Sequence, residues 1–191
     1  GIERCAVIGT SLGGLMLMLM AGESPQRLAG VVLNDVGCEV AEEGLARIAG
    51  YVGKLPPVSS WDEAAAQARE VNGVAAPDLD DADWLVFARR IYREDEQGIP
   101  RLDMDANIGR ALAEVGGTLA DPWELFDDMR MPVLEIRGAL SDILTPDILD
   151  EMKARKPELE VIEVANRGHA PLLDEPEALA AIDAFLDSLE Y

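Results

Sequence analysis

The sequence is poor in cysteine, histidine and basic residues, and these shortages narrow what the protein can be. Two cysteines, Cys5 and Cys38, are too few for a disulfide framework, and their spacing matches neither a zinc site nor a redox pair. Lys and Arg number 16 against 37 Asp and Glu, so a formal charge of −21 opposes binding to nucleic acid or to an anionic membrane. We interpret this acidic surface as a source of solubility and infer no substrate from it.

Long apolar runs are also missing. The longest, at residues 15–21, is far too short to span a membrane, and no charged segment with a cleavage site precedes it. We therefore expect a cytoplasmic protein without a membrane partner. No metal-binding cluster or cofactor fingerprint occurs in the sequence, which favours chemistry without a metal or a cofactor.

The remaining composition is that of a globular chain, because 191 residues with 49% hydrophobic content can bury a sizeable core. Short apolar runs alternate with helical segments at both ends of the chain, a pattern typical of an α/β fold with a parallel sheet between helices. Strands are expected at residues 5–8, 28–33, 132–136 and 159–164, and helices at 12–21, 147–156 and 175–189. The last helix carries a predicted apolar stripe of Leu179, Ile182, Phe185, Leu186 and Leu189.

The middle of the chain has a different texture. Residues 39–121 show little strand pattern, and proline and glycine separate helical stretches at about 42–52, 61–71, 82–92 and 106–115. We interpret this segment as a helical lid inserted into an α/β core formed by residues 1–38 and 122–191. The lid's aromatic residues either line an apolar substrate pocket or pack the lid's own core; they are Trp61, Trp84, Phe87 and Tyr92.

One short motif carries chemistry. Gly9-Thr10-Ser11-Leu12-Gly13 fits the G-x-S-x-G nucleophile elbow and lies between an expected buried strand and an expected helix, as that motif requires. Its glycines at positions 9 and 13 permit a tight turn and close packing of helix on strand, while Ser11 is held in a strained conformation that exposes its hydroxyl. The alternative interpretation is that Ser11 only caps the helix.

A serine nucleophile needs a base, and the chain contains a single histidine, His169, in the loop after the last expected strand. Because the carboxyl ends of parallel strands share one edge, Ser11 and His169 are expected at the same rim. The acid that orients the histidine is predicted to be Asp142, just beyond the strand at 132–136, with Asp35 after the second strand as the alternative.

Three segments of the chain resemble a known family. GTSLGG, RGALSDILTP and NRGHAPLLDEPEAL are similar to the nucleophile, acid and histidine segments of the α/β-hydrolase superfamily, and LNDVGCEV is similar to the start of the helical lid in bacterial members. The resemblance covers nearly the whole chain. It implies the roles of nucleophile for Ser11, acid for Asp142, base for His169 and oxyanion-hole donor for the backbone N–H of Leu12.

The chain departs from that family in extent. The superfamily's sheet usually has eight strands with the elbow after the fifth, so we expect the gene product to extend upstream of Gly1 and to supply a second oxyanion donor there. The strand at 5–8 is apolar on both faces and calls for a neighbour on each side. Alone, its edge is expected to pair with another copy of the chain or with a complementing N-terminal segment, or to leave the chain poorly folded.

The expected function is that of a serine hydrolase, which cleaves an ester-like or other carbonyl substrate, a small and largely apolar molecule, through an acyl-enzyme. Hydrolysis of a carbon–carbon bond and acyl transfer to another acceptor use the same triad and remain alternatives. A dehalogenase would carry Asp at the elbow, and Ser11 argues against it. An alternative of another class is a non-catalytic binding or receptor module with the same fold.

Overall fold

The computed structural model describes residues 1–105, 107–108 and 121–190, which belong to two compact units. The first unit comprises Gly1–Leu45 and Leu119–Tyr191, and the second comprises Ala46–Thr118. The division falls inside helix α2, Glu42–Tyr51. The helix expected at 106–115 lies almost entirely outside the described residues.

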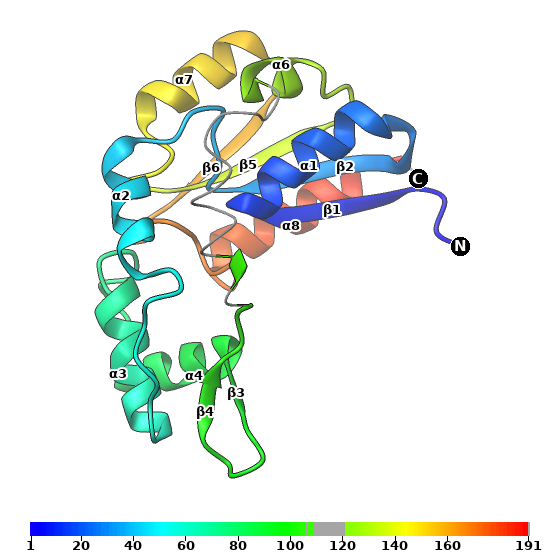
Figure 1. The fold of residues 1–191 in the computed structure, drawn as a ribbon. Coiled ribbons are helices and arrows are strands. Elements are labelled where there is room, and N and C mark those ends of the chain that lie inside the picture. Colours follow the sequence, from blue (N-terminus) through cyan, green and yellow to red (C-terminus); the bar gives the residue numbers. More distant parts are fainter. Residues whose placement is uncertain (106, 109–120, 191) are drawn as a thin grey trace. The chain divides into compact units, whose positions relative to one another are not determined.

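The first unit is built on a parallel sheet (Figure 1). Its strands are β1, Cys5–Thr10, β2, Leu28–Asn34, β5, Val133–Gly138, and β6, Glu160–Val164, arranged in the order β1-β2-β5-β6. Every neighbouring pair is parallel. The four expected strands and the α/β fold are thereby confirmed.

Helices connect and cover these strands. Helix α1, Leu12–Glu23, and a 3₁₀ turn at Pro25–Arg27 follow β1. Helix α6, Pro122–Asp127, precedes β5, and α7, Pro146–Arg155, joins β5 to β6. Helix α8, Pro176–Ser188, follows β6. Proline at the first helical position starts α6, α7 and α8, where its fixed φ and missing N–H cost nothing.

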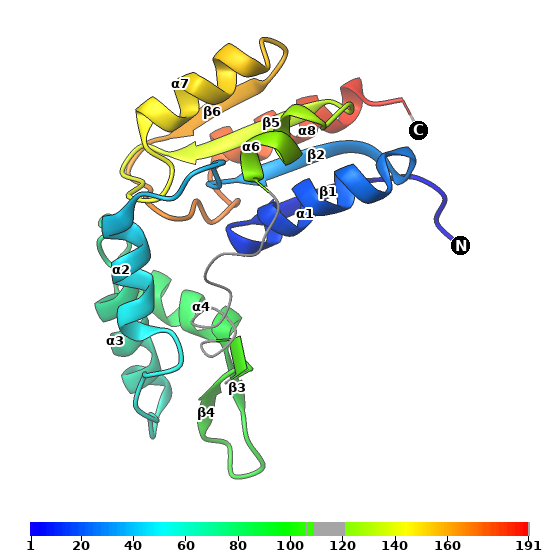
Figure 2. The same cartoon turned by 45° about the horizontal axis from the view of Figure 1, so that its top comes forward.

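Helices lie on both faces of the sheet (Figure 2). The core of this unit lies on both faces as well, because successive residues of a strand point to opposite sides. On β2, Val31 and Leu33 pack with residues of α1, α6 and α7, whereas Val32 packs with α8. The central strand β2 is buried along its whole length. The strands whose ends carry the candidate site are therefore held in a packed core.

Helix α8 buries a stripe that differs from the predicted one. Ala178, Ile182, Phe185 and Leu189 face the sheet, and Leu186 is partly buried beside them. Leu179 is 46% exposed, so its predicted place on the stripe is wrong. Spacings of four, three and four residues keep one helix face inward, and Leu179 is rotated from it by about 100°.

The first strand and helix are partly exposed among the described residues, although the strand is apolar on both faces. Ile8, Leu12 and Met16, which we call the edge patch, are 44%, 49% and 57% exposed. The cause is topological, since β1 is the edge of the sheet and pairs within the described part of the chain only with β2.

The second unit contains α3, Trp61–Asn72, and α4, Asp81–Ile91, which pack on each other. Acidic residues occupy the first turn of both helices, as expected from the helix dipole, and Asp80 with Asp83 forms a capping box on α4. A hairpin of β3, Tyr92–Glu94, and β4, Pro100–Leu102, was not predicted. Strands of three residues are too short to show an alternating pattern.

In the part of the chain that the structure describes, no helix combines the length and apolar character needed to cross a membrane.

The exposed edge predicts self-association. An unpaired strand with an apolar side chain invites pairing with a second strand, and a charge on it opposes that pairing. Sedimentation velocity over a range of concentrations should show the 191-residue chain associating and Ile8→Lys associating less. Val86→Lys, which replaces a valine 52% exposed on α4, serves as the matched control and should behave as the parent chain does. A parent chain that stays monomeric throughout contradicts this prediction.

Candidate active site

Ser11 lies in a strained turn between β1 and α1. Its backbone has φ 52° and ψ −121°, a region that residues other than glycine rarely adopt. The side chain makes no capping hydrogen bond with α1, which removes the interpretation of Ser11 as a helix cap. The conformation instead presents the hydroxyl at the end of the strand.

Two glycines allow α1 to pack closely on the sheet, and only one of them, Gly9, belongs to the motif. A Cβ on Gly9 would lie 2.7 Å from the carbonyl carbon and oxygen of Gly13. A Cβ on Gly13 would meet nothing within 4 Å, whereas one on Gly14 would lie 2.2 Å from Val36 Cγ1. Close packing of α1 on the sheet therefore depends on Gly9 and Gly14, and the predicted packing role of Gly13 is wrong.

His169 contacts both Ser11 and a carboxylate. Its Nε2 lies 2.9 Å from Ser11 Oγ, and its Nδ1 lies 2.8 Å from Asp35 Oδ2. The side chains of His169 and Asp35 are 7% and 0% exposed. Because a carboxylate only accepts hydrogen bonds, Nδ1–H donates to Asp35, and the free lone pair of Nε2 accepts the Ser11 hydroxyl.

The structure corrects the prediction for the acid. Asp35, the alternative, makes the hydrogen bond to Nδ1 that we assigned to Asp142. The loop after β5 presents Ser141 to Asp35 instead, with Ser141 Oγ donating to Asp35 Oδ2 over 2.6 Å. Ser141 Oγ also accepts the backbone N–H groups of Ile143 and Leu144, which fixes the loop conformation around the half-buried Asp142.

Asp35 is held from several sides. In addition to His169 and Ser141, the backbone N–H of Gly138 donates to Asp35 Oδ1 over 2.8 Å. The backbone of Asp35 has φ 55°, in the left-handed region that Asp tolerates better than most residues. The carboxylate thus accepts three hydrogen bonds in a buried setting, which restrains its position opposite the imidazole.

The loop that carries His169 is tied to the sheet by polar groups that the sequence did not point to. Asn34 Nδ2 donates to Thr10 Oγ1 and to the carbonyl of Pro171, both over 3.0 Å, and so links the ends of two strands to this loop. Arg167 and Glu175 form a buried ion pair of 2.7 Å across it. Asn34 ends β2 and Arg167 follows β6 closely, and only these positions could have marked them; Glu175 lies at the start of α8 and carried no such signal.

Leu12, the predicted oxyanion-hole donor, is the first residue of α1. A backbone N–H at this position has no acceptor within its own helix, and the dipole of α1 favours negative charge there. The arrangement provides one donor next to Ser11. Among the described residues no cluster of histidine, cysteine, aspartate and glutamate is placed to hold a metal ion.

A second carboxyl group lies buried below the site. Glu135 on β5 is fully buried, and burial together with the nearby charge of Asp35 raises its pKa well above the usual value for glutamate. Burial, with Glu135 as the next cause, raises the pKa of the Cys38 thiol to about 12. Burial and the neighbouring charge therefore favour the protonated form of Glu135, and Cys38 remains a thiol at neutral pH.

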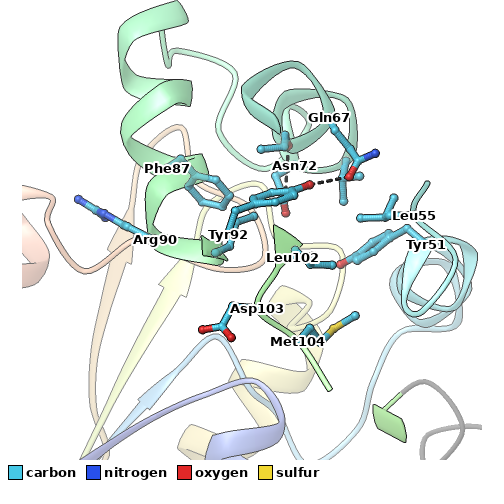
Figure 3. Close-up of a pocket in the computed structure, with 13 residues that line it drawn as sticks. Tyr51, Leu55, Gln67, Asn72, Phe87, Arg90, Tyr92, Leu102, Asp103 and Met104 are labelled. Atoms are coloured by element: carbon cyan, nitrogen blue, oxygen red, sulfur yellow. Dashed lines mark hydrogen bonds between the residues drawn. The ribbon is translucent and has the colours of Figure 1, made fainter. Parts of the chain in front are cut away.

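The predicted substrate-binding aromatics of the second unit divide into two groups. Phe87 and Tyr92 line a pocket of about 310 Å³ (Figure 3), in which the Tyr92 hydroxyl and Gln67 Oε1 are 2.5 Å apart. Trp84 is 2% exposed in the unit's core and meets Phe87 edge to face. Trp61 donates to Glu94 and lies under the guanidinium of Arg89.

Comparison with known proteins identifies the family. Residues 1–182 match the alpha/beta hydrolase family, so this chain belongs to that family. An alpha/beta hydrolase from Novosphingobium aromaticivorans is 44% identical, with a TM-score of 0.88 over 98% of this chain and 66% of its own. An esterase from Mycobacterium tuberculosis shares the fold, with 24% identity and a TM-score of 0.72 over 96% of this chain and 62% of its own.

A curated relative, the 3-hydroxybutyrate-oligomer hydrolase of Cupriavidus necator, is 28% identical over 96% of this chain and 65% of its own length. The chain thus spans somewhat less than two thirds of this relative and of the Novosphingobium hydrolase.

The raised pKa of Glu135 predicts how the free energy of unfolding depends on pH. Its folded pKa is raised, so above the unfolded glutamate value the unfolded chain releases a proton that the folded chain keeps. This group therefore lowers the free energy of unfolding as pH rises, until pH passes the folded pKa. Glu135→Gln removes the effect, so its stability relative to the parent, measured by urea unfolding, should increase as pH rises above the ordinary glutamate pKa of 4.5. The exposed Glu160→Gln is the control, and a difference independent of pH would contradict the assignment.

Proposed function

We propose that this chain carries the catalytic centre of a serine hydrolase that cleaves ester-like bonds in small, largely apolar molecules through an acyl-enzyme. The observation that supports this most is the continuous chain of contacts from Ser11 Oγ through His169 to Asp35, with both hydrogen bonds below 3.0 Å. Ser11 has a strained backbone, makes no helix-capping hydrogen bond and faces an oriented imidazole, and a protein that only binds its ligand does not need this arrangement.

The reaction begins when Ser11 Oγ attacks the substrate carbonyl carbon and passes its proton to His169 Nε2. The negative charge that develops on the carbonyl oxygen is stabilised by the N–H of Leu12. Asp35 stabilises the imidazolium and keeps its ring in place. The tetrahedral intermediate collapses as Nε2–H protonates the leaving alcohol, and a water activated by the same nitrogen then releases the acid and restores Ser11.

The choice of an ester rests on relatives. The Cupriavidus protein is named for hydrolysis of 3-hydroxybutyrate oligomers, and such oligomers are chains of short aliphatic esters. Solved structures of the same fold include proteins named as esterases. A short-chain ester such as p-nitrophenyl butyrate is therefore the first substrate to test.

The assignment of the acid can be tested by covalent labelling. A fluorophosphonate should phosphonylate Ser11, with the adduct located by peptide mass spectrometry, and Ser11→Ala should abolish the label. His169→Ala should slow labelling by about 10³-fold or more, and Asp35→Asn by about 10²-fold or more, because the base or its orientation is lost.

Asp142→Asn is the matched control for that experiment, since it makes the same chemical change on the loop after β5. Asp142→Asn should be labelled at a rate within about threefold of the parent's, because in this proposal Asp142 does not stabilise the transition state. A slow Asp142→Asn with a normal Asp35→Asn would return the acid to Asp142. Labelling that survives Ser11→Ala would refute the nucleophile.

We further propose that the second unit contributes to substrate choice through the pocket lined by Phe87 and Tyr92. Its volume lies at the small end of the range for ligand sites, and most of its lining is apolar. Val71→Trp, on the pocket wall, should raise KM for p-nitrophenyl butyrate by about tenfold with little change in kcat, because it removes binding alone. Val74→Trp, at a position 68% exposed and outside the lining, should leave KM unchanged. An unchanged KM in Val71→Trp would contradict this role.

A further inference from the structure

A glutamate lies directly beneath the turn that carries Asp35. Glu135 is 0% exposed, and its Oε1 accepts the backbone N–H of Val36 at 3.4 Å, a long hydrogen bond. Its Oε2 is buried without a hydrogen-bond partner. The carboxyl group therefore points into the protein below the active-site turn and not toward solvent.

The position is one that an apolar residue would fill at less cost. Glu135 pairs in register with Leu33 on one side and Val161 on the other. Burying a carboxyl group with an incomplete set of hydrogen bonds is costly, and such departures from the apolar pattern concentrate at functional sites. The cost calls for a role at the turn of Asp35 and Val36, where Glu135 accepts a backbone hydrogen bond.

That turn needs support. Asp35 has a positive φ of 55°, and Val36 is 2% exposed, so water does not readily replace the acceptor of its N–H group. Gly138, Ser141 and His169 donate hydrogen bonds to the Asp35 carboxylate. Glu135 supports the backbone of the same turn by accepting the N–H of Val36.

We propose that Glu135 is a positioning residue, which holds the Asp35–Val36 turn through the Val36 N–H and thereby keeps the Asp35 carboxylate on His169 Nδ1. This inference rests on the proposed triad and adds a fourth residue that acts through Asp35. Glutamine can make the same hydrogen bond, and methionine, of similar length, cannot.

The charged groups around Glu135 are consistent with a carboxyl that works as an acceptor without charge. Asp35 lies above it and raises its pKa, and the Cys38 thiol on the following segment lies near it. Asp121, Asp127 and Arg155, from the start and end of α6 and from α7, act on Cys38 from farther out. With a negative neighbour and a dry surrounding, the protonated form is favoured.

The single histidine allows a test that does not require catalysis. The 13Cε1 chemical shift of His169 can be titrated by NMR in the parent chain and in Glu135→Gln, Glu135→Met, Asp35→Asn and the control Glu160→Gln. A nearby carboxylate stabilises the imidazolium, so displacing it lowers the midpoint. Glu135→Met should lower the midpoint by about half a pH unit or more, whereas Glu135→Gln should stay within about 0.2 units of the parent.

The variants separate the possible failures. A Glu135→Met midpoint equal to the parent's would overturn the positioning role, and so would an equal fall in Glu135→Gln, because the group would then act through its charge. An unchanged midpoint in Asp35→Asn would instead refute the proposed triad. Circular dichroism checks folding, and Glu135→Leu replaces Glu135→Met if the latter does not fold.

Discussion

The hydrogen bond between Asp35 and His169 is the interaction on which the candidate site depends. It joins the segment after β2 to the loop after β6, and His169 then reaches Ser11 after β1. These segments are far apart in sequence but share one edge of the sheet, because all four strands are parallel. Without this contact the imidazole would have neither a defined tautomer nor a defined orientation toward the serine.

Two carboxyl groups near this contact have different roles because their surroundings differ. Asp35 receives three donors and faces the imidazole. Glu135 has one long contact to a backbone N–H, an unpaired oxygen and a raised pKa. The environment separates a carboxylate that can stabilise the imidazolium from a carboxyl group whose protonated form is favoured.

Much of this could be predicted from the sequence. Buried strands show as apolar runs, and the glycine-flanked Ser11 together with a lone histidine left one pair of candidates for nucleophile and base. Asp35 and Asp142 could not be separated, since each follows a strand at the same rim. The choice depends on the conformation of the loop after β5, which turns Ser141 toward Asp35.

Other features were hidden for physical reasons. Glu135 sits in an apolar strand and looks like an outward-facing residue until the register places it against Leu33 and Val161. Leu179 was misplaced because a helical stripe read from apolar residues alone can be off by one position. The edge position of β1 was expected from the family's strand order, but which side chains it exposes, Ile8, Leu12 and Met16, became clear only from the structure.

The central claim is that His169 Nδ1–H donates to Asp35, and proton NMR tests it most directly. With one histidine in the chain, a far-downfield resonance from this shared proton can be assigned without ambiguity by 15N labelling. We expect the resonance to be present in the parent chain, to persist in Asp142→Asn and to disappear in Asp35→Asn. Its absence from the parent, or its loss in Asp142→Asn but not in Asp35→Asn, would contradict the account.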